Sequence, residues 1–493
     1  MKGLQHRAAA VLVIIASLFI GVGTVTVAQA TPSSITSTTD DASGNGVATK
    51  SHGQTTFGSQ SPNVIAPPPS TFPADCPATI KCVVMPAPYV ANGGDVTDYG
   101  DYDVTNRPQD MKINTIVIHD TEGDLQSTLD TFNNSHSYVS IHYVVVASLN
   151  EVIEMVPNND MAWHAGNWYE NMHAIGIEHV GFSADSSSYT DTMYRLSADL
   201  VQYLTAKYNV PRDRAHILGH DNVSGTTAAA IPAMHTDPGE FWDWQKYMTL
   251  INGGVQLNAA ANPLTATSNF NLGVTVMPLW PLNKQPVTGC TSATSCVPAG
   301  LQPTNFVYLH AQPNANAPLF TDPVLGQGTT DINNTAARLY YGQTFAVADH
   351  KIDSGGLWLK VAVNGTYGWF YSPWTAPTAF PAIGGQYATP KTSSDVAVYG
   401  QPVPEKSEYP ADLISVPPAN TWIKFPTALP YTLKSGQKYK VLSTNVPTDY
   451  FYAWASDGSF PYDHTVFTGA TKYIEIQLGS RIAFVKANDV NLN

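Results

Sequence analysis

The spacing of apolar residues over 83–253 changes several times between strand-like and helix-like. The runs Thr115–Ile118 and His142–Ala147 are short and rich in β-branched residues, which is typical of buried strands. Asp124–Phe132 and Tyr194–Tyr208 instead have a helical pattern, the second with leucines four residues apart on one face. Strands interleaved with helices predict an α/β domain with helices packed on a mixed central β-sheet.

After residue 253 the pattern changes to short Val- and Tyr-rich runs separated by Asn, Pro, Thr and Gly, which predicts an all-β region. Residues 305–377 and 394–493 each combine a strand ending in a Gln-Pro turn with a strand pair around a Gly turn. We predict two small all-β barrels, which resemble bacterial SH3-like domains. Residues 254–304 are predicted to be a linker.

Residues 1–30 have the parts of a secretory signal peptide: basic residues near the start, an apolar stretch, and a final Ala-Gln-Ala cleavage site. An uncleaved membrane anchor is the alternative, because the uncharged stretch 8–30 is long enough to span a bilayer. Residues 31–73 are rich in Ser, Thr and Pro and predict a disordered tether. We therefore expect a protein that is secreted and extracellular, with no membrane contact after cleavage.

The charge and length of the chain limit its partners. It has 493 residues, with 24 Lys plus Arg against 38 Asp plus Glu and a net charge of −14. A single core rarely grows beyond about 250–300 residues, so several domains are expected. An acidic surface cannot bind a phosphate backbone through counterion release, which argues against nucleic acid and anionic membranes as partners. The sequence makes no prediction of an oligomeric state.

The four cysteines form two closely spaced pairs, Cys76 with Cys82 and Cys290 with Cys296. In an exported chain two local disulfides are the simplest of the three possible connectivities. Zinc binding is the competing use, but CxxC spacing is absent.

Histidines concentrate in the predicted α/β domain, which holds nine of the 14: 119, 136, 142, 164, 173, 179, 216, 220 and 235. His119 and His220 each follow a short apolar run, and Asp237 precedes a Pro-Gly turn. Two imidazoles and one carboxylate from three loops can hold zinc and leave a fourth position for water, which is the arrangement of a catalytic site. Taken singly, each has a structural explanation, as a buried or surface histidine or as a turn residue.

Six motifs in order carry a resemblance to a known family: IVIHDTEG, SIHYVVV, MAWHAG, AIGIEHVG, ILGHDNV and HTDPGEFWDW. Together they resemble the zinc-dependent N-acetylmuramoyl-L-alanine amidases of type 2, which share a fold with peptidoglycan recognition proteins. The likeness covers Lys112–Met248 and implies a zinc amidase domain at 83–253. It implies Zn²⁺ as cofactor, with His119, His220 and Asp237 as its ligands.

The resemblance also implies the reaction and two catalytic residues. The bond cut is the amide between N-acetylmuramic acid and the L-alanine of the peptidoglycan stem peptide. Glu178 corresponds to the general base. His235 stands where the family usually has Lys, and its reference pKa of about 6.5 favours activity at lower pH. Ile141 stands where some relatives have a catalytic Tyr, which leaves the proton transfer to Glu178.

The substrate groove is predicted from aromatic and polar residues in one short segment. Trp163, His164, Asn167 and Trp168 are expected to contact muramic acid or peptide, although Trp163 suits a buried core equally well. His142 and His173 are expected to be structural.

Aromatic residues are also abundant in the predicted barrels: Trp358, Trp369, Trp374 and Trp422. They could bind cell-wall carbohydrate or peptide, or only fill small β cores.

Two other functions are compatible with the same residues. One is a non-catalytic peptidoglycan-binding protein with this fold, but the presence of all three predicted ligands together with Glu178 argues for catalysis. The other is a different zinc hydrolase such as a protease, for which the HExxH helix is missing.

Overall fold

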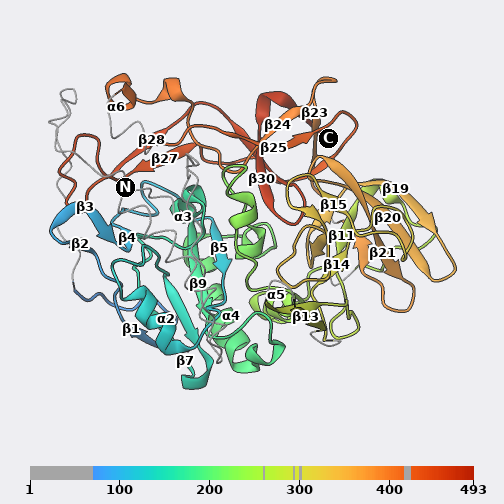
Figure 1. Cartoon of the computed structure of the whole chain (residues 1–493), viewed down its shortest axis with the longest axis horizontal. Helices are drawn as coiled ribbons and strands as arrows, with labels where there is room; N and C mark the ends of the chain where they lie inside the picture. The colour runs from blue at the N-terminus through green and yellow to red at the C-terminus, as the bar shows by residue number, and fades with distance from the viewer. Residues whose placement is uncertain (1–69, 259–260, 293–294, 299–301, 383, 416–422) are drawn as a thin grey trace, which may run out of the picture.

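The computed structural model describes residues 70–258, 261–292, 295–298, 302–382, 384–415 and 423–493 (Figure 1). The predicted signal peptide, nearly all of the predicted tether and Trp422 lie outside these residues. Within the described part, no helix combines the length and apolar character needed to cross a membrane.

A six-stranded mixed sheet forms the centre of the N-terminal half, with the strand order β1-β7-β6-β9-β5-β10. Strands β6, β9, β5 and β10 run parallel to one another, whereas β6 and β7 are antiparallel. Both faces of the sheet are covered, so β5 and β6 are fully buried and their sequences are continuous Val and Ile runs rather than alternating ones. The predicted mixed α/β sheet is confirmed. The strand bounds are β1 Lys81–Val84, β5 Thr115–Ile118, β6 Tyr143–Val146, β7 Glu151–Glu154, β9 Ala174–His179 and β10 Ile217–Gly219.

The helices begin at polar side chains that cap their first turns. Helix α2, Leu125–Phe132, follows Asp124, whose side chain accepts a hydrogen bond from the Ser127 backbone N–H. Helix α4, Asp191–Tyr208, buries the leucine face expected from its spacing and packs against α5, Trp244–Ile251. A further short helix, α3, spans Trp168–His173.

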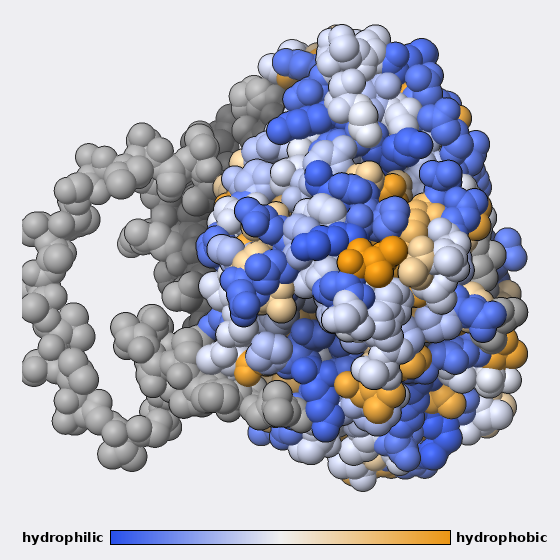
Figure 2. All heavy atoms as spheres, turned by 90° about the vertical axis from the view of Figure 1, so that its right-hand side faces the viewer, coloured by the Kyte–Doolittle hydropathy of each residue, from blue (hydrophilic) through white to orange (hydrophobic). Residues whose placement is uncertain are grey.

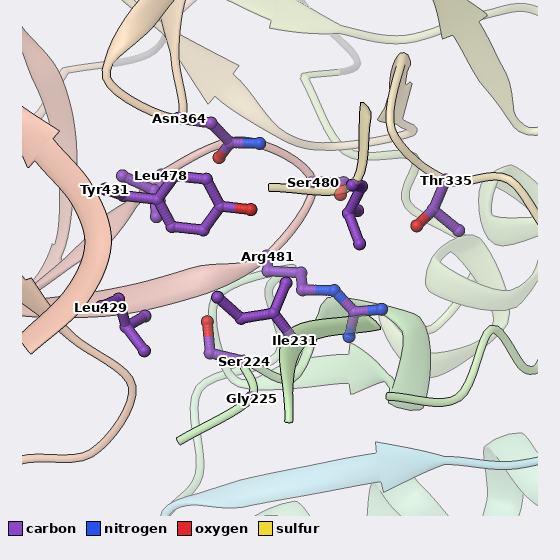
Figure 3. A pocket seen from close by; sticks show the side chains of 11 residues that line it. Ser224, Gly225, Ile231, Thr335, Asn364, Leu429, Tyr431, Leu478, Ser480 and Arg481 are labelled. Atoms are coloured by element: carbon purple, nitrogen blue, oxygen red, sulfur yellow. The ribbon is translucent and has the colours of Figure 1, made fainter. Parts of the chain in front are cut away.

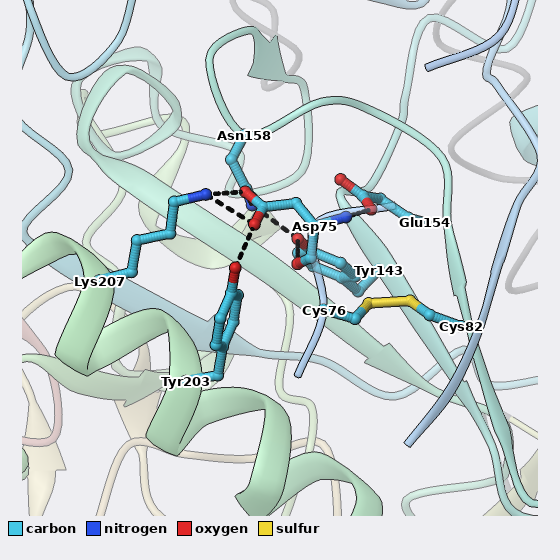
Figure 4. The surroundings of a disulfide bond; sticks show 8 residues. All are labelled: Asp75, Cys76, Cys82, Tyr143, Glu154, Asn158, Tyr203 and Lys207. Carbon is cyan, nitrogen blue, oxygen red and sulfur yellow. Dashed lines mark hydrogen bonds and ion pairs between the residues drawn. A yellow bond between two sulfur atoms is a disulfide. The ribbon is translucent and has the colours of Figure 1, made fainter. Parts of the chain in front are cut away.

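A disulfide and a polar cluster fix the segment that enters the first strand (Figure 4). Cys76 and Cys82 are bonded, as predicted. The neighbouring Asp75 carboxylate accepts hydrogen bonds from Lys207 Nζ at 2.6 Å and from Tyr203 Oη at 2.7 Å, both on α4. The segment is therefore held against α4 as well as by the covalent bridge.

The second cysteine pair lies in the hairpin of β12, Thr288–Ser292, and β13, Ser295–Pro298. Cys290 and Cys296 are directly opposite each other in its register. Their side chains lie outside the described part of the structure, so this disulfide stays a prediction.

The C-terminal half consists mainly of antiparallel strands, which confirms the predicted all-β character. The longest pairing is the sheet β19-β20-β21, and a seven-stranded sheet has the order β25-β24-β30-β29-β26-β23-β31. One short helix, α6 at Ala411–Ser415, was not expected. The likeness to SH3 barrels stays a prediction. The strand bounds of these two sheets are β19 Val347–Ile352, β20 Gly356–Val363, β21 Thr366–Pro373, β23 Tyr387–Pro390, β24 Val396–Tyr399, β25 Ala428–Leu433, β26 Tyr439–Ser443, β29 Tyr473–Gln477, β30 Ile482–Lys486 and β31 Val490–Leu492.

The segment 254–304, expected to be a linker, supplies part of the β core. Its strand β11, Val274–Val276, is fully buried and pairs with β18, Thr344–Phe345, and β22, Ala379–Pro381. Leu264 is buried in the same core. An apolar Val-Thr-Val run is stabilised by such burial, which a solvated linker would not provide.

The C-terminal half packs directly on the α/β domain. The hairpin of β27, Asp449–Tyr452, and β28, Thr465–Thr468, extends over the top of the domain, and β27 lies beside α3 (Figure 1). On the opposite side, the face around β19–β21 is mostly hydrophilic, with hydrophobic side chains in small separate groups (Figure 2). Apolar side chains scattered in this way are normal for an exposed surface.

Candidate metal centre

Three parallel strands end at the same edge of the sheet and bring the predicted site residues together. Ile118, the last residue of β5, pairs with the residue before Glu178 on β9 and with Gly219, the last residue of β10. His119 and His220 each come directly after their strand. Because the carboxyl ends of parallel strands meet at one edge, both imidazoles and the Glu178 carboxylate lie there.

The loop before α5 brings the third predicted ligand to the same edge. Asp237 Oδ2 lies 3.4 Å from His119 Nδ1, and its Oδ1 lies 3.2 Å from His220 Nδ1. One donor atom from each of the three residues lies within 4.8 Å of the others, and all three residues are buried. The Asp120 backbone N–H donates to Asp237 Oδ2 at 3.2 Å and so fixes the carboxylate.

Gly219 allows the two ligand loops to approach each other. A Cβ at this position would lie 2.9 Å from Pro238 Cδ and closer still to the side chain of Asp221. Glycine in the GH motif therefore lets the loop after Asp237 pack on the end of β10.

A histidine that binds a metal through one ring nitrogen usually donates a hydrogen bond from the other. The contacts of this second nitrogen therefore indicate whether the imidazoles suit a metal. His119 Nε2 lies 2.9 Å from His164 Nδ1, so a proton on Nε2 leaves the Nδ1 lone pair directed at the Asp237 side. His220 Nε2 is buried and has no hydrogen-bond partner among the described residues. Two imidazoles and one carboxylate form a donor set that fits zinc.

His164 lies behind a predicted ligand rather than in an open groove. Burial, together with the neighbouring His119, lowers its pKa well below the usual value, so its ring is neutral. Its Nδ1 can therefore accept a hydrogen bond from His119 Nε2–H. Its ring packs on β9 at Gly176, where a Cβ would lie 2.7 Å from the ring. Its position is that of a residue that orients His119.

Glu178 lies on β9, at the sheet edge that carries the predicted ligands. Its Oε2 atom is buried and has no hydrogen-bond partner in the described part of the chain. Burial and then the carboxylates of Asp237, Asp120 and Glu122 raise its pKa well above the usual value. Such a carboxyl group is suited to accept a proton and hold it.

His235 is the most solvent-accessible of the predicted site residues on these loops, with 50% of its side chain exposed. Its Nδ1 lies 3.6 Å from Asp237 Oδ1, and its ring centre lies 4.8 Å from that of His220. It therefore stands beside the three donors with one face open to a ligand.

Three of the residues predicted for the substrate groove do not line an open surface. Trp163, Asn167 and Trp168 are 3%, 2% and 4% exposed. Trp163 Nε1 donates to Asp103 at 2.8 Å, and Trp168 Nε1 donates to the Phe451 carbonyl at 3.0 Å.

The remaining residue of this set, Asn167, caps α3 and donates to the carbonyls of Ser224 and Gly400. All three residues thus act as core or as contacts with the C-terminal half. His142 and His173, expected to be structural, are buried and hydrogen-bonded.

Other residues at the site were not predicted from the sequence. Asp120 and Glu122 lie in the loop after His119, and Asp120 Oδ2 is buried without a hydrogen-bond partner among the described residues. The acidic pair could have been noticed in the motif HDTEG.

The fold and these contacts define an α/β protein with a candidate three-ligand metal centre at the carboxyl edge of its sheet. The family model of N-acetylmuramoyl-L-alanine amidase matches residues 109–240. The chain is 30% identical over 155 residues to N-acetylmuramoyl-L-alanine amidase A of Achromobacter lyticus, an alignment that covers 28% of this chain and 83% of that protein. The chain therefore belongs to the N-acetylmuramoyl-L-alanine amidase family.

Two further proteins are similar to part of this chain. The 1,6-anhydro-N-acetylmuramyl-L-alanine amidase AmpD of Salmonella typhimurium is 32% identical over 123 residues, or 24% of this chain and 59% of that protein. A solved structure of the E. coli amidase AmiD with the substrate anhydro-N-acetylmuramic acid-L-Ala-D-γ-Glu-L-Lys is 24% identical. That match covers 37% of this chain and 68% of that one, with a TM-score of 0.25.

Proposed function

We propose that this chain is a zinc-dependent peptidoglycan amidase that hydrolyses the bond between N-acetylmuramic acid and the L-alanine of the stem peptide. One observation carries the proposal: the donor atoms of His119, His220 and Asp237 converge within 4.8 Å at the sheet edge where the buried Glu178 Oε2 has no hydrogen-bond partner among the described residues. The family and the relatives named above support the choice of substrate.

His119 and His220 would hold the metal through their ring nitrogens and Asp237 through its carboxylate. Zinc bound there supplies Lewis-acid chemistry, which polarises a carbonyl and lowers the pKa of water from about 15.7 towards 7. Glu178 accepts the proton of the attacking water at its carboxylate and gives it to the departing amine nitrogen. His235, with its exposed face, donates a hydrogen bond to the oxyanion that forms at the scissile carbonyl.

The first experiment measures the metal and the reaction together. The purified chain is analysed for bound metal, and purified peptidoglycan is then digested with the native, chelator-treated and zinc-restored protein. We expect about one zinc per chain and release of free stem peptides that begin with L-alanine. Chelation should abolish the release, and added zinc should restore it. Release that continues unchanged after the metal is removed would refute the zinc mechanism.

The same digestion separates the alternatives. A chain that binds peptidoglycan and zinc but releases no new L-alanine amine is a binding protein. Cleavage within the stem peptide, with L-alanine still attached to muramic acid, identifies a protease.

We also propose that the chain is exported and that its C-terminal half contacts the cell wall. Both proposals come from the sequence: the signal-like residues 1–30 and the tryptophans of the β region. N-terminal sequencing of the exported protein should find Thr31 first. Sedimentation of Glu178→Gln with purified cell walls tests binding without turnover, and a protein that stays in the supernatant refutes it.

A further inference from the structure

An arginine in the turn between β29 and β30 contacts both loops that carry predicted metal ligands. Arg481 precedes β30, and one of its terminal nitrogens donates to the backbone carbonyl of Val223, three residues after His220. The other terminal nitrogen donates to the backbone carbonyl of His235 at 3.3 Å, two residues before Asp237. One guanidinium therefore joins two loops that are separate in the chain.

The residues on either side of Arg481 repeat this connection. The Asn222 amide donates to the Ser480 carbonyl at 3.1 Å, and the Ser224 hydroxyl donates to the Ile482 carbonyl. Three consecutive residues at the turn from β29 into β30 are thus hydrogen-bonded to the segment directly after His220. Figure 3 shows Arg481 close to Ser224 and Gly225, with Ser480 lining the same pocket.

The surroundings of Arg481 suit a structural cation rather than a ligand site. Its Nε atom is buried and has no hydrogen-bond partner among the described residues, and the nearby Asp221 carboxylate is fully buried. Arginine stays charged in such an environment, where its planar group can serve two carbonyls at once. The adjoining cavity has a volume of about 20 Å³, which is room for a single water.

We propose that Arg481 is a positioning residue of the metal centre, which holds the His220 loop and the Asp237 loop at the separation that metal binding needs. The C-terminal half then helps to hold the metal-binding loops in place, although the family match ends at residue 240. This inference rests on the proposed zinc function, but it is tested by metal affinity rather than by turnover.

The positive charge of Arg481 and its two hydrogen bonds have opposite expected effects on metal affinity. A cation near a divalent metal opposes its binding, so removing the charge alone would tighten the site. Loss of the two carbonyl contacts would instead let the ligand loops move apart and weaken metal binding. The direction of the change in affinity therefore tells positioning from charge.

The test uses the full chain with Arg481→Gln, Arg481→Lys and the control Arg195→Gln, which alters an exposed arginine of α4. Zinc Kd is measured by competition with a chromogenic chelator, and the cobalt(II)-loaded proteins are compared by their visible absorption. We expect Arg481→Gln to raise Kd about tenfold or more and to change the cobalt spectrum. Arg481→Lys should restore part of the affinity, and Arg195→Gln should match the wild type.

Each other outcome has a defined meaning. An Arg481→Gln protein with Kd within twofold of wild type, or with tighter binding, overturns the positioning role. If that variant does not fold, the same limits apply to Arg481→Lys. A wild-type chain that binds zinc but cleaves no amide refutes only the proposed function, whereas a wild-type chain that binds no zinc overturns both.

Discussion

The ion pair between Glu240 and Arg338 gives the most quantitative prediction. Glu240 lies three residues after Asp237, and Arg338 belongs to β17, Arg338–Tyr340, in the C-terminal half. Their side chains are 1% and 0% exposed. Arg338 also donates to the backbone carbonyl of Ile332 at 3.0 Å, whereas the Glu240 carboxylate has no further hydrogen-bond donor among the described residues.

This asymmetry sets the expected magnitudes. Removing one partner of a buried pair leaves an uncompensated charge and costs about 3–5 kcal/mol. Arg338→Met leaves the Glu240 carboxylate with no donor, so we expect a loss near the top of this range. Glu240→Gln leaves Arg338 with its carbonyl acceptors, so we expect about 3 kcal/mol. At roughly 2–4 °C per kcal/mol, Glu240→Gln should unfold about 6–12 °C and Arg338→Met about 10–20 °C below the wild type.

The assay is a double-mutant cycle followed by calorimetry and by urea unfolding. The double variant should lose less than the sum of the single variants, by about 2 kcal/mol or more, because each change removes the partner of the other. Lys246→Met, which breaks the surface pair with Asp191, is the control and should leave stability unchanged within error. Additive losses, or a loss below about 1 kcal/mol in Arg338→Met, would refute the reasoning.

Three further predictions concern the proposed catalytic carboxylate, one buried histidine and the disulfide. Glu178→Gln should retain zinc, measured by metal analysis, and lower kcat by about 10²–10⁴-fold; a rate near wild type removes Glu178 from the mechanism. His173 Nε2 lies 2.9 Å from Asp449, and although burial lowers the His173 pKa, the Asp449 carboxylate raises it to above its usual value. Its folded pKa then exceeds the unfolded one, so its contribution to stability is complete below about pH 6.5 and is lost as pH rises through the folded pKa. The difference in Tm between wild type and His173→Gln should shrink from pH 5.5 to 8.5, and a constant difference contradicts this. Cys76→Ser with Cys82→Ser should lower the free energy of unfolding by about 2 kcal/mol, the value for so short a loop, and free thiols titrated in the native chain would count against the bridge.

Local patterns were enough to predict much of the α/β domain. The face of α4 with Leu196, Leu200 and Leu204 is buried as its spacing indicated, because that spacing reports contact with a neighbouring layer. His119 and His220 could be placed at the sheet edge because each follows a short apolar strand. Their convergence with Asp237 could be inferred only from the resemblance of the motifs, since these three residues lie far apart in the chain.

The predictions that did not hold depend on contacts between distant segments. Trp168 is a buried contact with Phe451, a residue 283 positions away, and no periodicity in the sequence records such a pairing. An aromatic residue beside polar ones has the same local pattern in a sugar-binding groove and in a domain interface. The apolar residues of the expected linker were likewise informative only once β18 and β22 were known to flank β11.

The cap of α3 limits how the α/β domain could be joined to a different C-terminal half. Asn167 begins the helix and also donates to the carbonyl of Gly400, while the next residue donates its indole proton to Phe451. If the C-terminal half were exchanged for a foreign module, these polar groups would lose their acceptors. The new surface would have no carbonyl groups in matching positions. A different C-terminal half could therefore be joined here only if the sequence of α3 changed at the same time.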